Sequence, residues 1–136
     1  MKEWTLRVLL AGLALAFAAT SASAFLAPQG LLEPLGIQLT GPDALAEIRA
    51  AYGGFFAMTA ALCAVGALRA SSRGLALALL ALLQAGFVGG RLLSGWLDGP
   101  ATHPTSVMNF RLETIALLLC LGLLWWNQSG DTSASS

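Results

Sequence analysis

Residues 47–68 read EIRAAYGGFFAMTAALCAVGAL, in which a charged head precedes a long apolar run. A helix needs about 20 apolar residues to cross about 30 Å of hydrocarbon. The window 48–68 has this length and carries one charge, Arg49, next to its first residue. The sequence therefore predicts a membrane-spanning helix here, and it raises the question of why charge stands at the head of that helix.

Further windows share this apolar character and length, so the sequence predicts an all-α fold, an integral membrane four-helix bundle. The expected helices cover residues 8–27, 48–68, 74–93 and 107–126. The connection 28–46 holds three prolines and three glycines, which predicts a loop with at most a brief interfacial helix. We expect a single transmembrane domain over residues 1–127 and a disordered polar tail over residues 128–136.

The composition independently indicates a membrane protein, because 57% of the 136 residues are hydrophobic and 10% are charged. A soluble domain of this length could not bury so much apolar surface. Seven basic and seven acidic residues leave no basic excess, so nucleic acid is not expected as a partner. Cys63 and Cys120 lie inside apolar runs, where cysteine behaves as a small hydrophobe, so we expect no disulfide.

The first window has an alternative interpretation. A charged start, a short apolar stretch and the small residues SASA at 21–24 resemble a secretory signal that would be cleaved after Ala24. The apolar run continues through residues 25–27, however, and is then long enough to span a bilayer. We expect the helix to be retained, and cleavage of residues 1–24 stays open as the alternative.

Basic residues flank the expected spans on alternate sides. Lys2 and Arg7 precede the first helix, and Arg69 and Arg73 flank the turn between the second and the third. Cytoplasmic loops carry an excess of Lys and Arg. We therefore expect both termini in the cytoplasm, and the heads of the second and fourth helices at the outer face.

With this orientation, charged residues from three helices meet at the outer end of the bundle, namely Glu47, Arg49, Arg91, Arg111 and Glu113. Glu47 and Arg49 are two residues apart, hence on opposite sides of a helix, so each needs water or a partner on another helix. We expect one polar network with Arg91 at its centre, paired with Glu47 and Glu113, and with the Tyr52 hydroxyl as a further member. Such a network either fixes the helix register or holds a ligand, and the sequence leaves both open.

Glycines accompany these charges. Gly53 begins a ridge of small residues with Ala57 and Ala61, and Gly86, Gly90 and Ser94 form another. Small residues at this spacing let helix backbones approach closely in lipid. We therefore expect Gly53, Gly54, Gly86 and Gly90 to serve helix packing.

The string EIRAAYGG at 47–54, GRLLS at 90–94 followed by DG, and LET opening the fourth helix resemble a known family. It is the bacterial four-helix membrane family catalogued as domain of unknown function 4345, and the resemblance runs from about residue 8 to residue 126. The residues that match its pattern are Glu47, Arg49, Tyr52, Gly53, Gly54, Arg91 and Glu113. The family has no established activity, so the resemblance implies a four-helix fold in the bacterial inner membrane and no more.

No pattern indicates catalysis, a metal or a cofactor, since the chain lacks a Walker loop, a dinucleotide fingerprint, a Cys-x-x-Cys pair and a nucleophile elbow. We expect a small structural or accessory membrane subunit. The alternative is a binder or carrier of a small amphiphile or quinone at Arg49, Arg91 and Glu113, and an embedded enzyme is the weakest interpretation. The partners that follow are the lipid bilayer, a membrane-protein partner or a second copy of the chain, and a small amphiphile.

Overall fold

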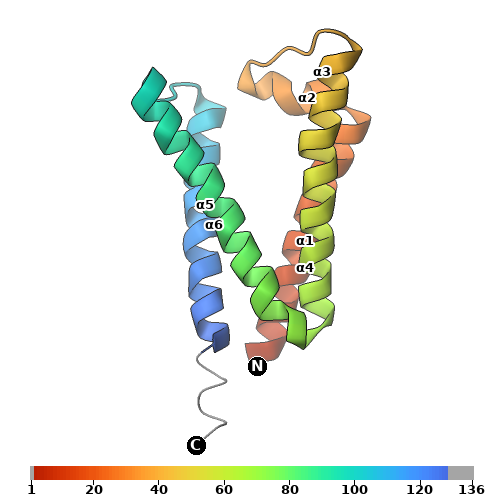
Figure 1. Ribbon diagram of the computed structural model, residues 1–136, viewed down its shortest axis with the longest axis vertical. Helices are drawn as coiled ribbons and strands as arrows, with labels where there is room; N and C mark the ends of the chain where they lie inside the picture. Colours follow the sequence, from red (N-terminus) through yellow and green to blue (C-terminus); the bar gives the residue numbers. More distant parts are fainter. Residues whose placement is uncertain (1, 129–136) are drawn as a thin grey trace, which may run out of the picture. The chain divides into compact units, whose positions relative to one another are not determined.

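The computed structural model describes residues 2–128, and within this range the chain forms helices and no strands (Figure 1). The elements in chain order are α1 (Lys2–Leu26), α2 (Pro28–Leu32), the 3-10 turn η1 (Glu33–Leu35), α3 (Gly41–Ile48), the π-helical segment η2 (Arg49–Gly54), α4 (Phe55–Leu68), the 3-10 turn η3 (Ala70–Ser72), α5 (Arg73–Asp98) and α6 (Pro104–Gln128). The all-α prediction is confirmed. The expected tail lies outside the described residues, apart from Gln128 at the end of α6.

The described residues contain four helical stretches long and apolar enough to cross a membrane. They are α1, the continuous run α3–η2–α4 over Gly41–Leu68, the run from η3 to the end of α5, and α6. Each expected window lies almost wholly inside one of these stretches, and the helices continue past the windows at most ends, because polar residues beyond the hydrocarbon still complete the helical hydrogen bonds. The chain thus has the architecture of a membrane protein.

The connection 28–46 differs from the expected loop, because helix occupies most of it. Only residues 36–40 are non-helical, and α3 already begins at Gly41. Pro34 and Pro42 each stand in the first turn of a helical element, where a missing N–H costs nothing. Gly36 then ends η1 in the left-handed region, at φ +74°. The prolines therefore start helices here and do not exclude them.

The described residues divide into two compact units where the sequence predicts a single domain. Unit 1 covers the chain up to Ala70, and in it α1 packs antiparallel against α4 and η2 (Figure 1). Unit 2 begins at Ser71 and is the antiparallel hairpin of α5 and α6. Each expected site residue belongs to one of these hairpins, so each hairpin is described by itself.

Candidate functional site

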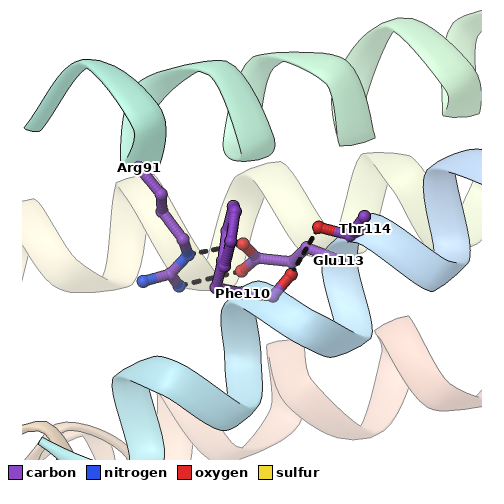
Figure 2. A network of polar contacts seen from close by, with 4 residues as sticks. All are labelled: Arg91, Phe110, Glu113 and Thr114. Carbon is purple, nitrogen blue, oxygen red and sulfur yellow. Dashed lines mark hydrogen bonds and ion pairs between the residues drawn. The ribbon is translucent and has the colours of Figure 1, made fainter. Parts of the chain in front are cut away.

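The charged centre of unit 2 is an ion pair between α5 and α6. The Arg91 guanidinium donates two hydrogen bonds to the Glu113 carboxylate, from Nε to Oε2 at 2.5 Å and from Nη2 to Oε1 at 2.8 Å (Figure 2). The two side chains are 34% and 18% exposed. A bidentate Arg–carboxylate pair of this kind is geometrically specific and stronger than a neutral hydrogen bond. The structure therefore pairs Arg91, the expected centre of the polar network, with Glu113, one of its two expected partners.

The hairpin places Arg91 and Glu113 at similar heights along the axes of α5 and α6. Arg91 precedes Asp98, the last residue of α5, by seven residues, which is about 10 Å along a helix. Glu113 follows Pro104, the first residue of α6, by nine residues, or about 14 Å. Because α5 and α6 are antiparallel neighbours, similar distances from their connecting turn place the charges opposite each other.

A groove of about 790 Å³ lies beside the ion pair, wholly within unit 2. Its lining comes from the second half of α5, the turn and the start of α6: Gly86, Phe87, Gly90, Arg91, Leu92, Ser94, Gly95, Gly99, Pro100, Ala101, Ser106, Val107 and Phe110. Arg91 is the charged member of this lining, and Ser94 and Ser106 contribute hydroxyls. Ligand sites typically enclose about 300–1,000 Å³ and combine apolar walls with a few polar groups. The groove has that size and that chemistry.

Gly86 and Gly90 line this groove, and the helix-packing role expected of them stays a prediction. A Cβ atom built on either glycine meets no described atom within 4 Å. The absence of side chains at these positions leaves space along one wall. Within unit 2 the two glycines thus belong to the open wall of the groove.

Phe110 and Thr114 surround the carboxylate on α6. The Thr114 hydroxyl donates to the Phe110 carbonyl oxygen at 2.8 Å, one turn back in the helix (Figure 2). The Phe110 ring stands beside the ion pair in the same view and also lines the groove. Both carboxylate oxygens of Glu113 accept hydrogen bonds from Arg91, whereas the Thr114 hydroxyl bonds to the backbone of its own helix.

The charges of unit 1 are used differently. Arg49 Nε donates to the backbone carbonyl oxygen of Phe25 at 3.3 Å, in the last turn of α1. At the other end of the hairpin, Arg7 Nε of α1 donates to the carbonyl oxygen of Ala67 at 3.1 Å, in the last turn of α4. Neither α1 nor α4 has a basic residue in its own last turn. The first span thus supplies a cation to the C-terminal end of α4, and η2 supplies one to the C-terminal end of α1.

Gly53 is in close contact with α1. A Cβ atom on Gly53 would lie 2.8 Å from Cζ of the Phe25 ring, and the Ser21 hydroxyl donates to the Gly53 carbonyl oxygen at 2.7 Å. A side chain at position 53 would therefore have to displace the Phe25 ring. At Gly54 the nearest atom, the Arg49 carbonyl oxygen, is 4.0 Å away.

Sequence reasoning missed the π-helical segment η2 and its partner Ser21. A π turn widens the helix and shifts its hydrogen-bonding register, and such segments are frequent at functional or strained positions. Ser21 belongs to the signal-like string SASA, and it is buried in α1 together with Ala24. The only available signal was the polar residue itself, inside a long apolar helix.

Tyr52 and Glu47 complete the set of expected site residues. The Tyr52 ring lies 5.9 Å from that of Phe56, which in turn stacks on Phe17 of α1 at 5.7 Å. Glu47 is exposed on α3. Both residues belong to unit 1, whereas Arg91 and Glu113 belong to unit 2. A single network of all these residues stays a prediction.

The model of one protein family, described as domain of unknown function (DUF4345), matches residues 5–126. The chain belongs to this family. Neither a curated protein nor a solved structure matches it.

The DUF4345 match over residues 5–126 spans both hairpins, so the Arg91–Glu113 pair and the Arg49 and Gly53 contacts all lie within the matched range. Among residues 2–128 of this DUF4345 protein, no group of three or more His, Cys, Asp and Glu side chains is placed to hold a metal ion. The described features that suit a ligand are therefore the groove of unit 2 and the ion-paired Arg91 in its lining.

Proposed function

We propose that this protein is a multi-pass protein of the bacterial inner membrane that binds a small amphiphile in the groove of unit 2. The observation that carries the proposal is the groove itself, about 790 Å³ between two membrane-length helices, with the ion-paired Arg91 on an otherwise mostly apolar wall. An amphiphile matches such a site, since its tail favours the apolar lining and its head favours the polar groups.

The interpretation as a purely structural or accessory subunit predicts a filled interior, in which the polar residues only fix helix register. Unit 1 fits that description, because Phe25 covers Gly53 and the charges bond to the backbone. The open glycines of unit 2 support binding, because they leave a space beside Arg91 that the side chains of the hairpin do not fill.

The proposed orientation places both termini in the cytoplasm. It is supported by the basic residues of the sequence, with Arg7 near the start of the first span and Arg69 and Arg73 around η3. Alkaline phosphatase fused at Gly36 or Ala101 should be active, and a fusion at Ser72 should be inactive. Activity at Ser72 alone would reverse the orientation.

Filling the groove tests the proposed function directly. Gly90→Leu places a side chain on the groove wall, whereas Gly122→Leu places the same side chain on α6 outside the lining. Both positions have no described atom within 4 Å of an added Cβ, so both variants should fold. Mass spectrometry of proteins purified in mild detergent should find a co-purifying amphiphile with the wild type and Gly122→Leu, and little with Gly90→Leu. Equal amounts in all three proteins would contradict binding in this groove.

A further inference from the structure

We propose that the groove of unit 2 selects amphiphiles whose head group is uncharged, and that Glu113 sets this selectivity by neutralising Arg91. The proposal rests on the proposed function and specifies the class of ligand. It makes Glu113 a specificity-determining residue that acts through Arg91, since Arg91 lines the groove and Glu113 does not.

The charge balance of the groove is the first argument. Arg91 is the charged residue of the lining, and the Glu113 carboxylate engages its Nε and Nη2 donors in a bidentate pair. An anionic head group in the groove would lose hydration without meeting a net positive charge, which is unfavourable in a weakly polar environment. An uncharged head group avoids that cost and can still accept hydrogen bonds from the groove.

The other charged or titratable groups of unit 2 near the α5–α6 turn do not add to the net charge of the groove lining. Arg111 is exposed and lies two residues from Glu113, hence on another side of α6. Asp98 at the end of α5 and His103 in the turn are also exposed to solvent. None of these three residues lines the groove.

The shape of the lining is the second argument. Gly86 and Gly90 are one helical turn apart and present backbone without side chains, and the rings of Phe87 and Phe110 also line the groove. A surface of glycines and aromatic rings suits a flat ring, since aromatic groups stack in offset or edge-to-face arrangements. The hydroxyls of Ser94 and Ser106 can donate to carbonyl oxygens on such a ring.

These features together describe a quinone-like head group, a flat ring with carbonyl acceptors and no charge. Arg91 lies about 10 Å from the end of α5, so the head group would lie at a shallow level in the span. The tail would then follow the apolar surface past Gly86 and Phe87, in the direction of the middle of α5.

The test compares probes that separate charge from shape. They are decylubiquinone, dodecanoate and the methyl ester of dodecanoate, each titrated into the full-length protein in mild detergent. The wild type should bind the methyl ester at least about tenfold more tightly than dodecanoate, and decylubiquinone more tightly still. Glu113→Gln should improve dodecanoate binding by about tenfold, because the Arg91 charge is then uncompensated. Glu33→Gln, which removes an exposed carboxylate of η1 in unit 1, should leave all ratios unchanged.

The outcomes distinguish this inference from the proposed function. If the wild type binds none of the probes, amphiphile binding in the groove is wrong and the inference falls with it. If the wild type binds dodecanoate as tightly as its methyl ester, the binding site stands and the selectivity proposal is overturned. The wild-type comparison needs no variant, so it decides the question even if Glu113→Gln unfolds. Unchanged dodecanoate binding by a folded Glu113→Gln protein would overturn the role of Glu113.

Discussion

Arg49 and Arg91 each stand close to a pair of glycines near the end of a membrane-length helix, yet the two hairpins use them in opposite ways. Arg49 donates to a backbone carbonyl of α1, and the neighbouring Gly53 is covered by the Phe25 ring. Arg91 donates to a side-chain carboxylate, and the neighbouring Gly90 faces a groove. The same residue types therefore close unit 1 and leave unit 2 open.

The difference lies in what stands across from each glycine. In unit 1 an aromatic side chain from the partner helix occupies the space above Gly53, and the arginines at both ends of the hairpin cap helix termini. In unit 2 no described atom lies within 4 Å of a Cβ on Gly86 or Gly90. A glycine ridge is thus a means of close packing only where the partner helix supplies a side chain to meet it.

The largest expected effect concerns the ion pair of unit 2. Glu113→Ala leaves the partly buried Arg91 without its carboxylate and should lower the free energy of unfolding by about 2 kcal/mol, less than for a fully buried pair. Arg91→Ala should have a similar effect, and the double variant should cost less than the sum by about 1–2 kcal/mol. Denaturant titrations in detergent measure these values, with the exposed Arg111→Ala as the control. Simple additivity would show that Arg91 and Glu113 are independent.

A smaller effect is expected at the glycines of unit 1. Alanine is favoured over glycine in a helix by about 1 kcal/mol, so Gly54→Ala, which meets only ordinary contacts, should be neutral or stabilising. Gly53→Ala must displace the Phe25 ring and should be less stable than Gly54→Ala by about 1–2 kcal/mol. In a Phe25→Ala background, Gly53→Ala and Gly54→Ala should have the same free energy of unfolding. A difference that persists without the ring would place its cause in η2 itself.

The smallest effects concern the arginine caps of unit 1. Arg7→Gln and Arg49→Gln should each lower the free energy of unfolding by about 0.5 kcal/mol, the usual scale for a cation at a helix C-terminus. The two caps lie at opposite ends of the hairpin, so their effects should add. If the stability effects of the two caps add and those of Arg91→Ala and Glu113→Ala do not, the two hairpins use their arginines in different ways. Strong coupling between Arg7 and Arg49 would contradict this difference.

Much of this architecture follows from the sequence. The four spans were predictable because apolar windows of membrane length leave little alternative to helix. The pairing of Arg91 with Glu113 was predictable because both lie at similar distances from a short turn between antiparallel helices. The hydrogen bonds of Arg49 and Arg7 could not be predicted, because both arginines donate to backbone carbonyl oxygens. Every residue carries such an oxygen, so the sequence does not show which one accepts the bond.

The groove and the π-helical segment were also beyond the sequence. The small-residue ridges at Gly53 and at Gly86 have the same spacing, and only the position of Phe25 on a distant part of the chain distinguishes the covered ridge from the open one. The π-helical turn at 49–54 has no side-chain period of its own over so short a length. Its bond from Ser21 joins residues far apart in the sequence.

The central claim, that unit 2 holds an amphiphile in an open groove, is tested most directly by labelling a cysteine in that groove. In a Cys63→Ala, Cys120→Ala background, Gly90→Cys places a thiol on the groove wall, and Leu93→Cys places one on α5 outside the lining. Both should react with N-ethylmaleimide in mild detergent. Decylubiquinone should slow the reaction at position 90 by about tenfold or more and leave position 93 unchanged. Equal rates at position 90 with and without decylubiquinone, at concentrations that saturate binding to the wild type, would contradict the account.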